Sequence, residues 1–389
     1  MRSFAWRAGV STVALLLGAT VVGLVALWPE ERTIEQPESR VSAKTEQAEV
    51  VAIAAVPCRV PGRTDCRRAT VRLLTGPDEG ARAAITVGDP GTEVGLAVGD
   101  RLRVYKNPVP EGVDNPQIEP YGFADFERRS PLLWLAVGFA ALVLVSGRWK
   151  GLRALAGLAA SLAIVVGFIV PAILAGKEPA LVALVGAFAV MLATIPLAHG
   201  LGAKAVAALL GSAASLSLVL LLAYAFTGLA RLTGFSSEEA LYLRATAGAD
   251  ISIQGLLLAG MVIGALGVLD DLTVSQASTV MALRRANPSF GFRALFGSAI
   301  SVGHDHIAAT VNTLFLAYAG ASLPVLLIFS LGGVPFQEAI NSEAVAQEIV
   351  AMLVGSIGLI AAVPVTTSLA AVLATHLPAA EASSGSHPH

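Results

Sequence analysis

The hydrophobic residues of this chain gather in long runs that few polar residues interrupt. A helix needs about 20 consecutive, mostly apolar residues to cross a bilayer core of about 30 Å. Eight runs approach or reach this length: Val10–Trp28, Pro131–Ser146, Leu152–Leu174, Ala180–Ala198, Val206–Phe226, Ile251–Asp270, Ile307–Leu331 and Ile349–Ala374. The pattern predicts an all-α membrane bundle of about eight transmembrane helices.

The first run has two interpretations. Arg2 and Arg7 precede it, as basic residues precede the apolar core of a cleaved signal peptide. However, the run is nearly 19 residues long, ends at Trp28, and is followed by proline and two glutamates rather than by small residues. We therefore favour a retained N-terminal transmembrane anchor at residues 1–28.

Residues 29–129 have a different pattern, in which short β-like runs alternate with polar segments. Turn signals rich in Gly, Pro and Asp separate these runs, which are Glu49–Val56, Ala69–Leu74, Ala83–Val87 and Arg101–Tyr105. Four or five short strands in such a length predict a small β-barrel-like domain. The segment Asn107–Arg129, rich in proline and then in aromatic and charged residues, predicts a linker on the membrane surface.

The composition supports a membrane protein and argues against several other classes. Of the 389 residues, 55% are hydrophobic and only 14% are charged, against about 25% charged residues in soluble domains. The formal net charge of −2 argues against a basic surface for nucleic acid. The sequence contains no Walker loop and no serine-hydrolase or zinc-protease motif. We expect contact with a lipid bilayer, no nucleic-acid partner, no nucleotide-binding motif and no enzymatic activity.

The distribution of Lys and Arg predicts the orientation, because short cytoplasmic loops are richer in these residues. With the N-terminus inside, nine basic residues fall on the cytoplasmic side: Arg2, Arg7, Arg148, Lys150, Arg153, Lys204, Arg284, Arg285 and Arg293. Only three fall in the short outer loops: Lys177, Arg231 and Arg244. This orientation places residues 29–129 outside, a seven-helix domain at residues 130–375 in the membrane, and a disordered tail at residues 376–389 in the cytoplasm.

Cys58 and Cys66 are the only cysteines, and both fall in the predicted extracytoplasmic domain. In an oxidising compartment, such a pair favours a disulfide. The alternative is two unrelated reduced thiols.

Ionisable residues inside transmembrane segments point to function, because each is costly to bury. The segment Gly264–Ser278 carries Asp270 and Asp271. On a helix, Asp271 falls in a stripe of small residues, which lets a neighbouring helix approach closely; the stripe comprises Gly260, Gly264, Gly267, Ser275 and Ser278. We therefore expect Asp271 to face the bundle interior and Asp270 to lie nearer to water. The alternative is that both aspartates mark a water-exposed end of a span.

A second polar segment, Ser301–Gly320, enters the membrane from the same predicted side. Its helix carries Asp305 and Asn312 on one face and His306 on the neighbouring face. The predicted cation site or proton relay comprises Asp270, Asp271, Asp305, His306 and Asn312. Oxygen ligands favour Mg²⁺ or Ca²⁺, and the histidine would shift the preference towards Mn²⁺ or Zn²⁺. Apart from such a divalent cation, no cofactor is expected. The alternative is a hydrogen-bonded contact between two helices; an acid–base pair of aspartates is disfavoured because no protease motif accompanies it.

Several segments have distinctive sequences: GALGVLDDLTVSQAS, SVGHDHIAATVNTLFLAYAGASLP, GRWKGLRAL, PLAHG, EEALYL and VGSIGLIAAVPVTT. They resemble the YibE/F-like family of bacterial membrane proteins over roughly Tyr121 to Ala374. One departure is His304, where members of the family generally carry Arg or Lys. The resemblance implies a multi-pass protein of the bacterial plasma (inner) membrane. It supplies no substrate, cofactor or catalytic residue.

These observations favour a transporter or permease for an ion or small solute, with Asp271 and Asp305 in its path. Prolines inside or at the ends of four spans support this hypothesis, because broken helices are typical of ion pathways; they are Pro171, Pro196, Pro324 and Pro364. The alternative is a non-transport envelope sensor or assembly scaffold whose β domain binds a partner. The expected protein partner is a second copy of the chain or an envelope protein.

Overall fold

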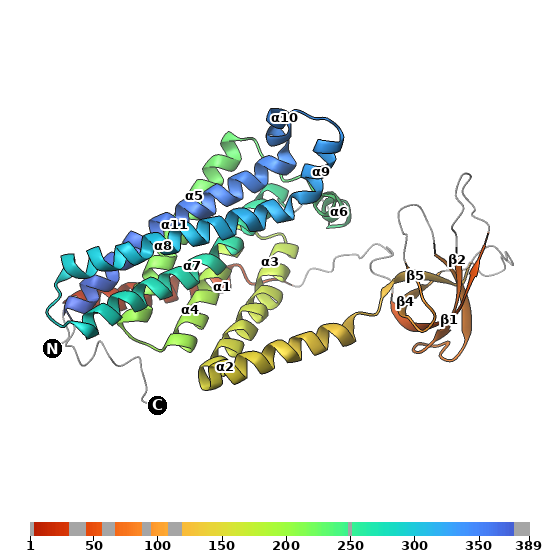
Figure 1. Ribbon diagram of the computed structural model, residues 1–389, viewed down its shortest axis with the longest axis horizontal. Helices are drawn as coiled ribbons and strands as arrows, with labels where there is room; N and C mark the ends of the chain where they lie inside the picture. Colours follow the sequence, from red (N-terminus) through yellow and green to blue (C-terminus); the bar gives the residue numbers. More distant parts are fainter. Residues whose placement is uncertain are drawn as a thin grey trace. The chain divides into compact units, whose positions relative to one another are not determined.

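The structure is a computed structural model that describes residues 4–30, 44–56, 67–87, 95–107, 119–247 and 251–376. The chain divides into two units (Figure 1): a β-rich unit, Ile34–Leu142, and a helical unit formed by Met1–Thr33 and Val143–His389. Cys58, Cys66 and the tail from residue 377 lie outside the described residues. The disulfide and the disordered tail therefore stay predictions.

The β-rich unit contains a five-stranded antiparallel sheet with the order β3-β2-β1-β4-β5. Its strands are β1 (Thr45–Ala55), β2 (Arg67–Leu73), β3 (Arg82–Val87), β4 (Arg101–Lys106) and β5 (Tyr121–Phe126). Alternate apolar residues point to one face and form a small core; its fully buried members include Ala48, Val50, Ala69, Val71, Ile85, Leu102 and Val104. The four strands predicted from the sequence are confirmed, whereas β5 lies in the segment that was predicted to be a linker.

The two edge strands, β3 and β5, contact each other, so the sheet curls into a half-barrel. Glu119, just before β5, accepts a hydrogen bond from the backbone N–H of Thr86 in β3 at 2.6 Å. At the start of β5, the buried Tyr121 donates its hydroxyl to Asp78 Oδ2 at 2.5 Å. These contacts cover edge groups that would otherwise be open to pairing with another strand.

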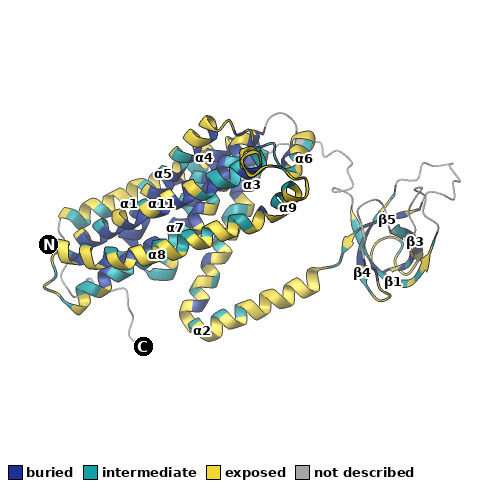
Figure 2. Cartoon of the chain, turned by 45° about the horizontal axis from the view of Figure 1, so that its top comes forward, coloured by how far each residue is buried: buried dark blue, intermediate teal, exposed yellow. Residues whose placement is uncertain are grey.

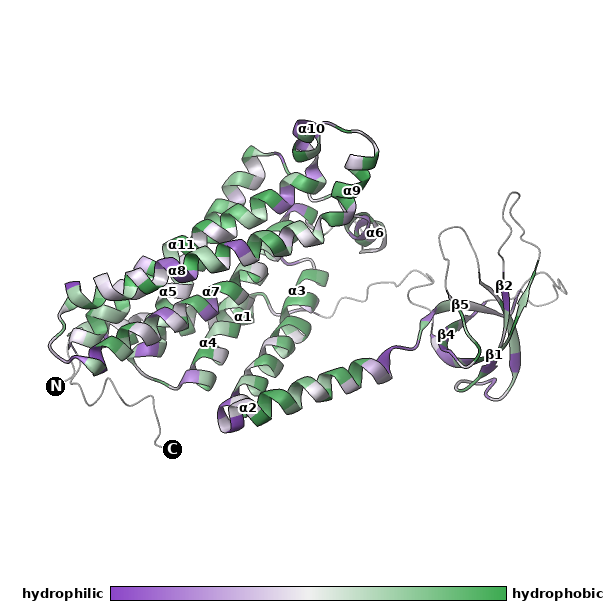
Figure 3. Cartoon of the chain, in the orientation of Figure 1, coloured by the Kyte–Doolittle hydropathy of each residue, from purple (hydrophilic) through white to green (hydrophobic). Residues whose placement is uncertain are grey.

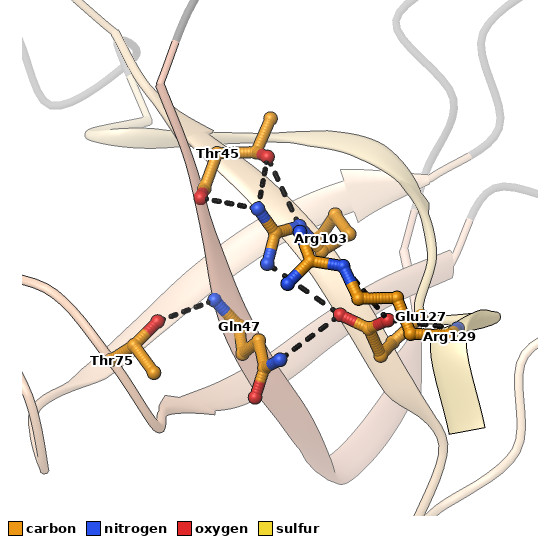
Figure 4. A network of polar contacts seen from close by, with 6 residues as sticks. All are labelled: Thr45, Gln47, Thr75, Arg103, Glu127 and Arg129. Atoms are coloured by element: carbon orange, nitrogen blue, oxygen red, sulfur yellow. Dashed lines mark hydrogen bonds and ion pairs between the residues drawn. The ribbon is translucent and has the colours of Figure 1, made fainter. Parts of the chain in front are cut away.

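A polar network joins β1, β4 and the segment that follows β5 (Figure 4). Glu127 accepts hydrogen bonds from Gln47 Nε2 at 3.1 Å and from the backbone N–H of Arg129 at 3.0 Å. Arg103 lies 3.5 Å from the same carboxylate and donates to Thr45 Oγ1 at 2.6 Å. The hydrogen bond from Arg129 is the main cause that lowers the pKa of Glu127. The network therefore holds an ionised carboxylate where the sheet meets the first helix after it.

The helices surround a core formed mainly by small and branched apolar side chains (Figure 2). The elements are α1 (Phe4–Ala26), α2 (Arg129–Ile164), the π-helix η1 (Val165–Ile169), α3 (Val170–Leu174), α4 (Pro179–His199), α5 (Ala203–Leu229), α6 (Glu238–Ala247), α7 (Ile253–Ala286), α8 (Phe292–Ala321), α9 (Leu323–Leu331), α10 (Phe336–Asn341) and α11 (Glu343–His376). At the centre, α5, α7 and α11 pack against one another; α4 packs against α7, and α8 packs against α11.

Glycines lie where the central helices approach most closely. A Cβ atom built on Gly211 of α5 would overlap Thr366 of α11, and one built on Gly358 of α11 would overlap Val219 of α5. Gly303 of α8 likewise faces a side chain of α11. Because a larger residue would push the helices apart, these glycines determine how closely α5 and α8 pack against α11.

Among the described residues, six helices are long and apolar enough to span a membrane, or seven if the bent pair α8–α9 counts as one span. In Figure 3, hydrophobic residues predominate along these helices. The prediction of eight spans is therefore not confirmed. One candidate, Arg129–Leu174, has 46 residues, about 70 Å of helix at 1.5 Å per residue. It is interrupted at Arg148, whose φ of 48° and ψ of −124° are not helical. This break lies between two of the apolar runs in the sequence.

Candidate functional site

A layer of hydrogen-bonded side chains crosses the apolar core of the helical unit. The fully buried Gln276 of α7 donates from Nε2 to the carbonyl oxygen of Ala299 on α8 at 2.7 Å and to Thr367 Oγ1 on α11 at 2.8 Å. One turn away, Thr273 forms a 2.6 Å hydrogen bond with Ser212 of α5. The layer therefore links α5, α7, α8 and α11. The sequence analysis missed it, because single Ser, Thr and Gln residues in apolar helices give no distinctive pattern.

Several buried polar atoms in and near this layer have no hydrogen-bond partner in the described part of the chain. They are Ser215 Oγ, Asp270 Oδ1, Gln276 Oε1 and Thr366 Oγ1. An unpaired buried polar atom costs about 1–3 kcal/mol, so a core that serves stability alone contains few of them. Oxygen atoms of this kind suit contact with water, a proton or a hard cation.

Asp270 is partly buried near the middle of α7, where this helix faces α4. Its Oδ2 atom is 3.4 Å from the hydroxyl of Thr194, while its Oδ1 atom is buried without a partner. The Thr194 hydroxyl also lies 2.9 Å from the carbonyl oxygen of Val190. Because a hydroxyl has a single hydrogen to donate, the Asp270 carboxylate receives at most a shared hydrogen bond.

The prediction that Asp271 faces the bundle interior is wrong. Asp271 is exposed, as are Gly264 and Gly267 in the same stripe, whereas Asp270 is the partly buried aspartate. The buried face of α7 instead carries larger residues such as Leu266 and Leu269. These residues bury more apolar area against α4, α5 and α11 than glycine does. The small residues therefore lie on the opposite face.

Asp271 belongs to a charged cluster where α4 meets α5. It interacts electrostatically with His199, the last residue of α4. The Nδ1 atom of His199 is 3.1 Å from Nζ of Lys204 in the first turn of α5. Gly200 makes this contact possible by adopting a φ of 77° at the end of α4. Lys204 was absent from the predicted site, because only the tight turn reveals its position.

The residues of α8 do not meet the aspartates of α7 directly. Asp305, His306 and Asn312 are exposed, and within the described ranges no hydrogen bond or ion pair links them to Asp270 or Asp271. The described residues also contain no group of three or more His, Cys, Asp or Glu side chains that could hold a metal ion. A cation site shared by α7 and α8 therefore stays a prediction.

A cavity of about 290 Å³ lies at the other end of the bundle, between α6, α7, α8 and α11. Its lining is mostly apolar but includes Tyr318 of α8 and Gln347 and Glu348 of α11. A second cavity, of about 510 Å³, lies between α1, the π-helix η1 and α4. Its lining is apolar apart from the hydroxyl of Thr20 and the indole of Trp28. The smaller cavity, of about 290 Å³, therefore has more polar groups that could bind a ligand.

Comparison with known proteins assigns the chain to a protein family. No curated protein and no solved structure matches the chain. A family model described as YibE/F-like protein matches residues 135–376, a range that includes α4 to α11. The matched region covers more than half of the sequence and contains Asp270, the charged cluster and the smaller cavity. The chain therefore belongs to the YibE/F-like family.

Proposed function

We propose that this multi-pass membrane protein is a transporter for an ion or small solute, with Asp270 as its coupling carboxylate. The observation that carries the proposal is the environment of Asp270 in the middle of a candidate membrane helix. One carboxylate oxygen is buried without a partner, and the other has only the shared hydroxyl of Thr194. A carboxylate that is buried with so few partners is costly unless it takes up a proton or a cation. Reversible uptake of this kind is what couples transport to an ion gradient.

Proline residues and a bend within the helices of the bundle support the same proposal. Pro196 lies inside α4, close to Thr194, and Pro364 lies inside α11, close to Thr366. Proline leaves a backbone carbonyl without its helical donor and bends the helix. In addition, α8 and α9 meet at an angle of 56°. Bent and discontinuous helices are common in secondary transporters.

We further propose eight spans in the bacterial inner membrane, with both termini in the cytoplasm. Arg148 would divide Arg129–Leu174 into two spans, and the bent pair α8–α9 would form one. The excess of Lys and Arg in the predicted inner loops supports this orientation. The cluster around Asp271 would then face the cytoplasm, while the smaller cavity and the β-rich unit would lie outside.

Purified full-length protein in liposomes tests the transport proposal. Currents on a solid-supported membrane are measured after concentration jumps of H⁺, Na⁺, K⁺, Mg²⁺ and n-butylamine. We expect at least one of these cations to give a current above that of empty liposomes, and we expect Asp270→Asn to abolish it. Glu338→Gln, which changes an exposed carboxylate in α10, should keep the current. A folded parent protein without any current, or a fully active Asp270→Asn variant, would contradict the proposal.

A further inference from the structure

The smaller cavity brings together side chains from four helices that are distant in sequence. Ser237 and Ala240 come from the region of α6, Gly260 from α7, Tyr318 from α8 and Glu348 from α11. Its volume of about 290 Å³ is close to the lower limit of small-molecule sites, about 300 Å³. The remaining lining is largely Ile, Leu and Met. The cavity therefore combines apolar walls with a few convergent polar groups.

Among the described residues that line this cavity, Glu348 is the only charged one. Its side chain is half-buried, and its Oε1 atom accepts a hydrogen bond from Gln347 Nε2 at 3.2 Å. Gln347 is itself fixed, because its Oε1 atom accepts a hydrogen bond from Ser236 Oγ at 2.7 Å. In the described part of the chain, no hydrogen bond occupies the second carboxylate oxygen of Glu348. This oxygen is therefore available to a ligand.

The lining selects for one chemical class of ligand. The described lining contains no Lys, Arg or His, so it offers an anion no counter-charge. A single carboxylate among apolar walls is also a poor site for a divalent metal ion, which takes several oxygen ligands. Apolar walls with one carboxylate instead match a cation that carries hydrocarbon groups. We propose that this cavity binds a small organic monocation, either a primary amine or a quaternary ammonium ion, with Glu348 as its counter-ion.

The position of Tyr318 connects the cavity to the aspartates of α7. A Cβ atom built on Gly264 would lie 3.3 Å from the hydroxyl oxygen of Tyr318, so the tip of this phenol lies beside α7 at Gly264. Gly260 lines the cavity on one side of that point, and Gly267 and Asp271 follow on the same exposed face of α7. If the chain is a transporter, as proposed above, the cavity is its outer binding site and Tyr318 separates that site from the inner aspartates. Binding itself does not depend on this role.

Isothermal titration of the detergent-purified full chain tests the binding site, with n-butylamine and tetramethylammonium at pH 7 as probes. We expect saturable binding of at least one probe by the parent protein. Glu348→Gln should raise the Kd by about 10- to 100-fold, because the cation loses its counter-charge and a primary amine also loses a charged hydrogen-bond acceptor. Glu338→Gln removes an exposed carboxylate outside the cavity and should leave the Kd unchanged. Absence of binding by the parent, or an unchanged Kd in Glu348→Gln, would overturn the inference.

A second pair of variants tests the location without changing a charge. Of the described atoms, none lies within 4 Å of a Cβ atom built on Gly260 or on Gly267, so both positions accept a side chain. Gly260→Leu should fill the cavity and abolish binding, whereas Gly267→Leu, outside the lining, should retain it. Equal binding by the two variants would overturn the assignment. Competition by n-butanol as strong as that by n-butylamine, or competition by Mg²⁺ at equal concentration, would overturn the ligand class.

The results for binding and for transport are separable. Glu348-dependent binding without any current would support the cavity as a cation site and contradict the proposed transport. Loss of current in Asp270→Asn, combined with absence of amine binding, would support transport and contradict the cavity site.

Discussion

Gly211 of α5 faces Thr366 of α11 so closely that a Cβ atom on the glycine would overlap the threonine hydroxyl. The Cα atom of Thr366 would lie only 3.3 Å from that Cβ atom, so rotation of the side chain alone does not relieve the overlap. Gly211→Ala should therefore destabilise the protein by about 1–3 kcal/mol, as overpacking of a dense core does. Gly267→Ala, at an open position of α7, should have little effect. Thermal unfolding in detergent, followed by circular dichroism, measures both variants, and equal losses would contradict the packing argument.

The small-residue stripe of α7 shows what a sequence pattern can and cannot predict. The pattern correctly placed Gly264, Gly267 and Asp271 on one face of a helix that ends at Ala286. It did not predict what that face contacts, because small residues suit both a tight helix contact and an open surface. The close contacts involve Gly211 and other glycines instead, and their partners are distant in sequence.

Other parts of the fold were predictable to different degrees. The four strands β1 to β4 follow from alternating apolar residues and from turn signals. By contrast, β5 was missed because Gly122 and Asp125 weaken its strand pattern. Asp270 was identified as a member of the site, but its partial burial depends on how α4 packs against α7. That packing has no local signal in the sequence.

Gln276 should be important for stability, because it is fully buried and its amide joins α8 and α11 to α7. Gln276→Leu removes both hydrogen bonds and leaves the carbonyl oxygen of Ala299 without this donor. We expect a loss of about 1–3 kcal/mol and a lower unfolding temperature. Gln254→Leu is the matched control, because Gln254 is exposed and makes one hydrogen bond, to the carbonyl oxygen of Leu232. A control that is destabilised as strongly would argue against a special role for the buried layer.

The β-rich unit should lose local stability in acid through Asp78. Its Oδ2 atom accepts hydrogen bonds from Lys106 Nζ at 2.7 Å and from the Tyr121 hydroxyl at 2.5 Å. The hydrogen bond from Lys106, followed by that from Tyr121, lowers the pKa of Asp78 below its ordinary value of 3.8. A carboxylate whose folded pKa is lowered stabilises the fold above its unfolded pKa and loses this contribution as the pH falls through the folded pKa.

Hydrogen exchange of the full chain, corrected for intrinsic rates, measures this effect in peptides that contain β5. In the parent protein, protection should be constant near pH 5 and should decrease below pH 3.8, the ordinary pKa of an aspartate. Asp78→Asn should have weaker protection at pH 5 and a smaller decrease in acid. Identical pH profiles for the two proteins would refute a role for Asp78.

The proposed orientation predicts that the α7–α8 connection is cytoplasmic and that α10 is outside. Ser289 lies in that connection, and Gln337 lies in α10; both are exposed. In a background with Cys58→Ser and Cys66→Ser, a membrane-impermeant maleimide should label Gln337→Cys in intact cells. It should label Ser289→Cys only after the membrane is permeabilised. The reverse labelling pattern would invert the topology, and the smaller cavity would then open to the cytoplasm.

The exposed polar face of α8 predicts self-association. His304, Asp305 and His306 are exposed on α8, just before the apolar run Ile307–Leu331, and polar side chains this close to the bilayer core are costly in contact with lipid. In a two-fold dimer with its axis along the membrane normal, equal surfaces meet at equal depth. The Asp305 carboxylate and the two imidazoles of each copy would then lie close to the same residues of the other copy, where these groups can form hydrogen bonds to one another. We therefore expect two copies to associate through α8.

Asn312, two turns from Asp305 on the same exposed face, is the position at which to test this association. In the background without Cys58 and Cys66, Asn312→Cys should form disulfide-linked dimers when native membranes are oxidised, because a two-fold axis along α8 brings the two copies of this position together. Leu162→Cys is the control, since Leu162 of α2 is 61% exposed and lies outside α8. Collisions between monomers would cross-link both positions alike, whereas a specific dimer cross-links only Asn312→Cys. Equal cross-linking of the two positions, or no cross-linking at Asn312→Cys, would contradict a dimer through α8. The polar residues of this helix would then require a different protein partner.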